Sequence, residues 1–504
     1  MGPFQSPELG NSGFLRLVAI MAGLTACAVL TRFPFLYNTG VDEAFYLVVG
    51  RQWLEGMTPY AYSFDVKPPL LFALTAGAEF VFGANLFAAK ALAMVSVSAT
   101  ACALYVFGRR FLGVSAGVTA ALLYIVSSLT LGGTFSPAEL TMAPFTAFGM
   151  LLGCLAALTQ IRPRLWLLLA AGLCLGAAAC VKQTALFEAL ALAAFLFVGR
   201  PLTGGLKSVV LLAAGFLVVP LGFAFYFLAD GHFAAFFADA VIAAVGRVSV
   251  FYLGWNETLT GLLLGLMLML PVIILAAAAW VFPGGSKSSV LPFVGAWTAG
   301  ALGGVLATRA ALVIYFLPLL PPLCLMAGAF VQHWGTRIPG RKRLVMAAAI
   351  TAVAAYSAFF TAPLFFAGRD NLASAHEAAA AMRGAGLKSD DRILVADRDL
   401  IVYLASGANP PKVVFHPLHL LCGFPLPDNA NALADSLKSR PAFIVEANPL
   451  YARACEIPER RLLLDGALSR DYCQLGQFRN TLTGAGSGSL VVFGLKERAG
   501  ARCL

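Results

Sequence analysis

Long apolar runs constrain this chain more than any other feature of its sequence. Of its 504 residues, 60% are hydrophobic and only 12% are charged, and many of the hydrophobic residues gather in runs long enough to cross a bilayer. Crossing about 30 Å of hydrocarbon takes about 20 helical residues. We therefore expect a polytopic α-helical membrane protein with eleven transmembrane helices, at residues 14–33, 87–108, 113–131, 140–160, 164–181, 184–199, 208–228, 259–281, 290–307, 311–331 and 344–366.

The basic residues indicate how these helices are oriented. Segment 68–82 is apolar but short, begins with two prolines and contains Glu79, so we predict a juxtamembrane helix instead of a span. With this assignment twelve basic residues share one side of the membrane, which the positive-inside bias makes cytoplasmic. They are Arg16, Arg109, Arg110, Arg162, Arg164, Arg200, Lys207, Lys287, Arg337, Arg341, Lys342 and Arg343. The net charge of +10 thus reflects topology and predicts no nucleic-acid partner.

The N-terminal and C-terminal ends of the chain differ in character. The first apolar run is long and lacks the cleavage pattern of a signal peptide, so we expect a retained anchor and a cytoplasmic N-terminus. Beyond Phe366 the composition changes, and residues 367–504 are predicted to form a soluble α/β domain on the other side of the membrane. Its expected helices are 371–383 and 430–438, the latter capped by Asp428, and its expected strands are 392–396, 413–415, 442–446 and 490–495.

Cysteines in this tail suggest a disulfide if the domain lies in an oxidising compartment. Cys455 and Cys473 are 18 residues apart and are the pair we predict, with Cys422 as a rival partner. Sequence alone does not fix the connectivity, and free thiols remain the alternative.

A cluster of charges follows the first apolar run, in the predicted loop 34–86. It contains the adjacent acids Asp42 and Glu43, then Arg51, Asp65 and Lys67, which is followed by two prolines. A chain with so few charges rarely places both signs beside a membrane segment without a function. Other pieces predicted on the same side lie at residues 134–139, 182–183, 230–257 and 308–309, so a site could assemble from these loop ends.

The Asp-Glu pair after the first membrane helix, the Thr-Pro-Tyr sequence at 58–60 and the Lys-Pro-Pro sequence resemble the first periplasmic loop of GT-C glycosyltransferases. The order and spacing of segments over residues 14–330 are similar to lipid A aminoarabinose transferases and protein O-mannosyltransferases. This resemblance implies a GT-C transmembrane domain at residues 1–366 in a bacterial inner membrane, with a periplasmic tail domain. It also implies inverting transfer of a sugar from a polyprenyl phosphate to lipopolysaccharide, an envelope glycan, a lipid or a protein hydroxyl.

The resemblance assigns roles within the charged loop. Asp42 matches the catalytic aspartate, which acts as the base for the acceptor hydroxyl; alternatively it caps the following helix. Glu43 is expected to orient a cation or the sugar, or else only to favour the helix dipole. Lys67 matches the lysine that contacts the donor phosphate, although a lysine whose charged end reaches the membrane surface would also fit.

Further donor-binding candidates lie in the same loop and in the other outer loops. Glu139 begins a predicted membrane helix, and Lys182 lies at a helix junction. His232 and Arg247 lie in the long outer loop. Arg309, which is near Tyr315, could bind phosphate through two hydrogen bonds. Helix-start placement, interfacial anchoring or simple solvation explains each of them equally well. These candidates are Tyr60, Glu139, Lys182, His232, Arg247, Arg309 and Tyr315.

Other classes of function leave more of the sequence unexplained. No phosphate-binding loop, dinucleotide fingerprint or metal-ligand spacing is evident, so no cofactor is predicted, and a divalent metal ion stays open. A transporter or flippase of lipid-linked glycans would need polar groups along a path through the membrane and is usually built from two similar halves. The sequence displays neither feature. A non-catalytic scaffold would leave the acid and lysine cluster without a purpose.

Overall fold

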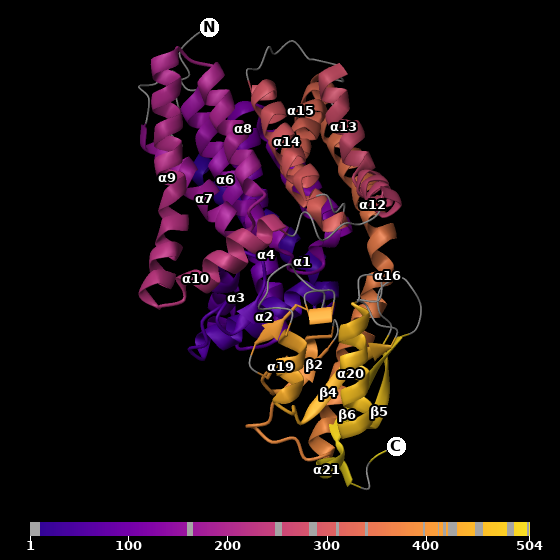
Figure 1. Ribbon diagram of the computed structural model, residues 1–504. Helices are drawn as coiled ribbons and strands as arrows, with labels where there is room; N and C mark the ends of the chain where they lie inside the picture. The colour runs from indigo at the N-terminus through magenta and orange to yellow at the C-terminus, as the bar shows by residue number, and fades with distance from the viewer. Residues whose placement is uncertain are drawn as a thin grey trace.

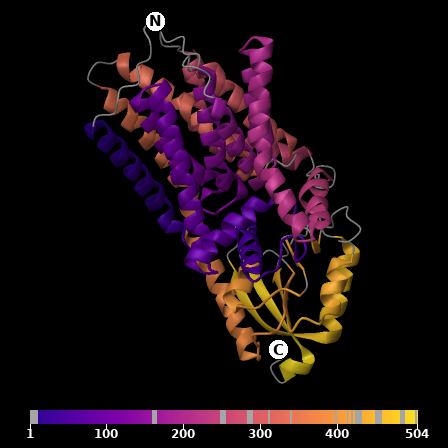
Figure 2. The ribbon, with the colours of Figure 1, turned by 90° about the vertical axis from the view of Figure 1, so that its left-hand side faces the viewer.

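The structure of the protein is a computed structural model. It describes residues 11–158, 165–246, 255–281, 290–308, 312–337, 341–396, 399–411, 413–416, 420–421, 431–448, 457–480, 488–500 and 503. A bundle of long helices occupies one end of the molecule, a small sheet domain occupies the other, and short helices lie between them (Figure 1). The N-terminus and the C-terminus lie at opposite ends (Figures 1 and 2).

The helical bundle accounts for every predicted membrane segment. Eight segments of the described chain are long and apolar enough to cross a bilayer, and a bent pair would make a ninth crossing. The eight helices are α1 (Asn11–Arg32), α4 (Leu86–Phe111), α5 (Val114–Ser128, continued by η2, Leu129–Gly133), α6 (Ala138–Leu158), α9 (Leu202–Ala229), α14 (Val290–Ala307), α15 (Leu320–Arg337, preceded by η4, Val313–Leu319) and the first half of α16 (Lys342–Gly384).

Three of the eleven predicted spans depart from straight, full-length helices. The predicted span 259–281 is bent by 71° between α12 (Trp255–Leu268) and α13 (Leu270–Val281). Helices α7 (Leu165–Val181) and α8 (Ala185–Val198) are shorter than a full crossing over their described residues. Apolar runs in the sequence therefore located the helices correctly, but hydropathy alone did not reveal the bend or the short lengths.

Small residues bring neighbouring helices close together. A Cβ atom added at Gly172 or Gly176 of α7 would overlap the backbone of α9, and one added at Gly215 of α9 would overlap the backbone of α7. Glycine lets membrane helices approach this closely and gain van der Waals contact, which is the main attraction between helices in lipid.

A juxtamembrane layer lies below the bundle (Figure 1), and its part within residues 34–86 was predicted. It consists of α2 (Val41–Leu54), α3 (Pro69–Phe82), α10 (Phe233–Phe237) and η3 (Ala238–Ala243). A Cβ atom at Gly50 of α2 would lie 2.5 Å from Glu79 Oε2 and 3.0 Å from the Ala76 nitrogen, so α2 and α3 are in close contact. The prediction that segment 68–82 forms a helix is confirmed, and this helix is too short to count among the candidate spans.

The C-terminal domain contains the predicted α/β sheet. Its four strands are β2 (Ile393–Val395), β4 (Phe443–Asn448), β5 (Tyr472–Asn480) and β6 (Gly488–Leu495), in the order β2-β4-β6-β5. Strands β2 and β4 are parallel, and the other neighbours are antiparallel. The helices are α17 (Ile401–Ser406), α19 (Ala432–Lys438), α20 (Pro458–Asp471) and α21 (Lys496–Ala499).

Several expectations for this domain need correction. The separate helix predicted at 371–383 is the end of α16, which continues from the bundle into the C-terminal domain without a break, so the predicted boundary at residue 366 lies inside it. The predicted strand at 413–415 exists as β3 (Val414–Phe415), but it does not join the main sheet. Strand β5 and helices α17, α20 and α21 were not predicted. The proposed cap Asp428 lies outside the described residues.

The predicted cysteine pairing was wrong. Cys473 of β5 forms its disulfide with Cys503 near the C-terminus, 30 residues away, and not with Cys455. Cys422 and Cys455 lie outside the described residues. Sequence spacing favoured the shorter loop, whereas the antiparallel β5–β6 pair brings the end of the chain back to the start of β5.

The C-terminal domain is attached to the first loop by hydrogen bonds. Strand β1 (Ser63–Phe64) of the loop pairs in parallel with β3, Ser63 with Val414 and Phe64 with Phe415. The guanidinium of Arg51 donates hydrogen bonds to the Ala408 carbonyl at 3.0 Å and to Asn409 Oδ1 at 2.8 Å.

Candidate functional site

Asp42 lies in the first turn of α2, with hydrogen-bond donors on both of its carboxylate oxygens. His416 Nε2 is 3.0 Å from Oδ1, and the Tyr46 hydroxyl donates to Oδ2 at 3.2 Å. The residue that precedes α2 as its N-cap is Gly40, so Asp42 does not cap the helix. Its side chain remains 29% exposed and can meet a substrate.

Lys67 is close to this carboxylate, as the predicted site requires. Its Nζ lies 4.0 Å from Asp42 Oδ2 and 5.8 Å from the centre of the Tyr46 ring. The Tyr60 hydroxyl donates a 2.7 Å hydrogen bond to the Lys67 carbonyl, and Tyr60 itself has φ +71°, which is unusual for a non-glycine residue. Tyr60 therefore holds the backbone of Lys67, immediately before Pro68 and Pro69 start α3.

Tyr46 connects the acids of the site. Burial raises the pKa of its phenol well above the usual value, and the carboxylates of Asp42, Asp65 and Glu139 raise this pKa further. Tyr46 thus remains a protonated donor at neutral pH. Of these three acids, Asp42 is the one that accepts its hydrogen bond.

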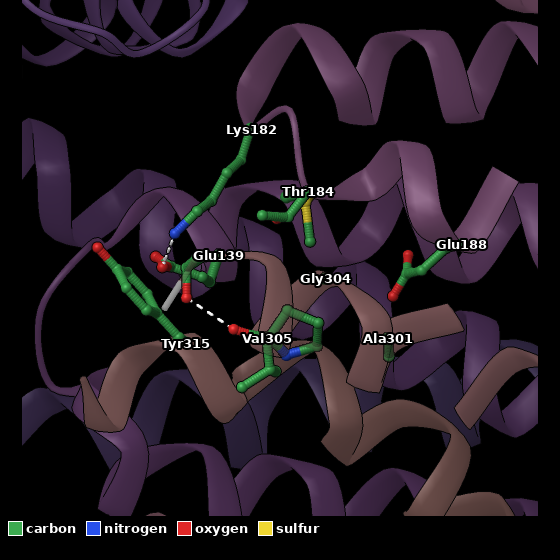
Figure 3. A pocket seen from close by; sticks show the side chains of 11 residues that line it. Glu139, Lys182, Thr184, Glu188, Ala301, Gly304, Val305 and Tyr315 are labelled. Atoms are coloured by element: carbon green, nitrogen blue, oxygen red, sulfur yellow. Dashed lines mark hydrogen bonds and ion pairs between the residues drawn. The ribbon is translucent and has the colours of Figure 1, made fainter. Parts of the chain in front are cut away.

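Glu139, Lys182 and Tyr315 come together beside a pocket, as Figure 3 shows. Glu139 begins α6, Lys182 follows α7, and Tyr315 belongs to η4. Lys182 forms an ion pair with Glu139, and its Nζ lies 3.9 Å from the centre of the Tyr315 ring. The two ion-pair side chains are only 8% and 2% exposed, and with Glu188 they line a small cavity between the helices.

Glu43 occupies a different environment. Lys90 of α4 donates to both of its carboxylate oxygens at 2.9 Å, and the Gly40 amide also donates to it at 3.3 Å. Because the Glu43 and Lys90 side chains are 1% and 4% exposed, this pair attaches α2 to the bundle. The position fits the expected role of orienting a cation better than direct contact with a sugar.

The remaining candidates are less informative. His232, just before α10, pairs with Asp230 at 2.8 Å, and its side chain is 39% exposed. Arg247 and Arg309 lie outside the described residues. Within the described part of the chain, no group of three or more His, Cys, Asp or Glu side chains could hold a metal ion.

Sequence reasoning missed two residues of this region. Lys90 is a lysine inside a predicted membrane helix, and such a residue signals an ionic partner. His416 follows a predicted strand in the tail domain, and nothing in the sequence indicates that this strand meets the first loop. Its contact with Asp42 depends on the two-residue β1–β3 pairing.

The bundle, its loop helices and the sheet domain together define a polytopic membrane protein with the GT-C fold. ArnT from Cupriavidus metallidurans bound to undecaprenyl phosphate has a similar structure, with a TM-score of 0.64 at 14% sequence identity, covering 98% of this chain and 100% of that one. The apo form of ArnT from the same organism gives 0.60 at 15% identity, covering 95% and 98%.

Sequence comparison finds a family model that matches about a third of the chain. Residues 66–227 match the model of the family described as dolichyl-phosphate-mannose-protein mannosyltransferase. A search of curated proteins found no match. The predicted resemblance to GT-C superfamily membrane glycosyltransferases is thereby confirmed.

Proposed function

We propose that this protein is an inverting glycosyltransferase that moves a sugar from a polyprenyl phosphate to an acceptor hydroxyl. The observation that carries the proposal is the pairing of an accessible carboxylate with a cation, Asp42 and Lys67, 4.0 Å apart on a loop beside the membrane bundle. The family match and the similarity to ArnT bound to undecaprenyl phosphate support a lipid-phosphate donor.

The chemistry follows from these two groups. The acceptor oxygen attacks the anomeric carbon as its proton passes to Asp42, and the bond from that carbon to the phosphate oxygen breaks. The polyprenyl phosphate leaves with the electron pair, and the Lys67 ammonium stabilises its charge as a point-charge contact. A single carboxylate acting as a base gives inversion, since retention normally needs a second, nucleophilic carboxylate.

We further propose that the protein lies in a bacterial inner membrane with its C-terminal domain in the periplasm. The first loop and this domain lie at one end of the bundle (Figure 1). Basic residues near the start of α1 (Arg16) and of α9 (Arg200 and Lys207) support a cytoplasmic assignment for the other end. The acceptor is then a periplasm-facing hydroxyl of lipopolysaccharide, another envelope glycan, a lipid or a protein.

The test is a transfer assay with purified protein, polyprenyl-phosphate-linked sugars and acceptors from the cell envelope. Asp42→Asn keeps the size of the side chain but removes the base, so transfer should fall by about 10²- to 10⁴-fold. Full turnover by this variant would refute the assignment of the base. Movement of labelled lipid across liposomes without any transfer would instead indicate a flippase.

A further inference from the structure

His416 brings the C-terminal domain into direct contact with Asp42, although the two residues are 374 positions apart in the chain. The β1–β3 pairing places His416 next to the first loop, and its ring lies edge to face with Phe45 of α2 at a centroid distance of 5.8 Å. Arg51, on the same helix as Asp42, holds the C-terminal domain through Ala408 and Asn409. Two independent attachments therefore fix the histidine against α2.

The direction of the hydrogen bond between the two residues can be determined. An ionised carboxylate only accepts hydrogen bonds, so the His416 nitrogen that faces Asp42 Oδ1, Nε2, must carry a proton. Both the neutral tautomer protonated at Nε2 and the imidazolium satisfy this requirement. With its proton directed to the carboxylate, Nε2 does not act as the base toward the acceptor.

The exposure of the two side chains also indicates that Asp42, and not His416, meets the substrate. The Asp42 side chain is 29% exposed, whereas the His416 side chain is 9% exposed and lies behind it. Each carboxylate oxygen has two lone pairs, so Oδ1 can accept from His416 and still receive a proton from a substrate. Substrate can thus reach the aspartate while the histidine holds it.

We infer that His416 is a positioning residue for the transfer reaction, and that docking of the C-terminal domain completes the active site by orienting Asp42. This inference rests on the proposed role of Asp42 as the base. The histidine fixes one carboxylate oxygen and Tyr46 fixes the other, which limits rotation of the side chain. A base must lie within hydrogen-bond reach of the proton it removes, so loss of this orientation slows the chemical step.

The test compares two substitutions in the full-length protein. His416→Leu removes the donor while retaining bulk, and His416→Gln keeps an N–H donor at similar reach. For His416→Leu we expect kcat to fall about 10- to 100-fold, in the range of one charge-assisted hydrogen bond, with KM for the lipid donor nearly unchanged. His416→Gln should restore most of kcat. His376→Gln, on the exposed face of α16, serves as the matched control and should behave as the unmodified protein.

The outcomes separate this inference from the proposed function. Unchanged kcat in His416→Leu, while Asp42→Asn is inactive, would overturn the positioning role and leave the transferase intact. Equal loss in His416→Leu and His416→Gln would also overturn it, because a donor would then not suffice. No transfer by the unmodified protein with any polyprenyl-phosphate sugar would refute the proposed function itself. Thermal unfolding of each variant in detergent identifies a loss that comes only from misfolding.

Discussion

Two buried ion pairs of similar construction should respond differently to the same substitutions. In each pair an acid in the first turn of a helix meets a lysine from another part of the bundle: Glu139 with Lys182, and Glu43 with Lys90. All four side chains are at most 8% exposed. Removing one partner leaves a buried charge without compensation, which costs about 3–5 kcal/mol, whereas replacing both by neutral groups of similar size is often nearly neutral.

We therefore expect Lys182→Met and Lys90→Met each to lower the free energy of unfolding by about 3–5 kcal/mol. Adding Glu139→Gln to the first, or Glu43→Gln to the second, should recover most of that loss. Both double variants should be about as stable as the unmodified protein, as measured by unfolding in detergent. Lys90 also donates a hydrogen bond to the Thr134 carbonyl at 3.1 Å. The Glu43→Gln, Lys90→Met double variant should therefore remain about 1 kcal/mol less stable than the unmodified protein.

Transfer activity should then distinguish the two pairs. The Glu139–Lys182 pair lines a cavity and lies near the acids around Tyr46, so its neutral double variant should lose about 10- to 100-fold in kcat/KM, the contribution of one charge-assisted hydrogen bond. The Glu43–Lys90 double variant should keep most of its activity because that pair only attaches α2 to α4. Equal activity of the two double variants would refute this division between a binding pair and a structural pair.

Substitutions at three other places test the remaining contacts. Lys67→Ala should raise KM for the lipid donor more than Lys67→Arg does, because charge matters before geometry at a point-charge contact; equal KM values would make Lys67 an interfacial anchor. Burial raises the pKa of Glu79 from 4.5 to about 8. Between these two pH values the folded protein keeps a proton on Glu79 that the unfolded chain has released. The free energy of unfolding should therefore fall as the pH rises from 4.5 to about 8. Glu79→Gln should remove that slope and exceed the unmodified protein in stability by up to about 5 kcal/mol above pH 8; a difference independent of pH in detergent unfolding would contradict this. Reduction of Cys473–Cys503 should cost the C-terminal domain about 3–4 kcal/mol on the chain-entropy model, and peptide mapping without reductant should recover the linked peptides; finding both cysteines alkylatable would disprove the bridge.

Local patterns in the sequence were sufficient to predict most of the bundle. Apolar length located the membrane helices, and the distribution of basic residues showed that segment 68–82 does not span. Both signals are local, because each membrane helix must bury an apolar surface in lipid and form its own backbone hydrogen bonds whatever its neighbours are. The continuity of α16 was missed because the Gly-Arg-Asp-Asn sequence at 368–371 looks like the end of a membrane helix, whereas the helix continues into the C-terminal domain.

Contacts between distant segments were not predictable in the same way. The sequence marked Asp42 and Lys67 because both lie in one short charged loop, and Glu139 and Lys182 because each lies at a helix end. It gave no sign of His416, since a two-residue strand such as β1 has no detectable periodicity. The disulfide partner of Cys473 was missed for the same reason, because spacing does not determine which strands pair.

The two lysines of the site differ in how readily they can meet a phosphate. Lys182 is in direct contact with Glu139, so a phosphate that binds Lys182 must compete with a buried carboxylate already in place. Lys67 lies 4.0 Å from Asp42 Oδ2, which is too long for a hydrogen bond, and that carboxylate also has donors in Tyr46 and His416. A phosphate that binds Lys67 therefore does not have to displace a hydrogen bond between Lys67 and Asp42. We accordingly expect Lys67 to make the first contact with the donor phosphate, while the donors around Asp42 keep the base oriented after the lysine has moved.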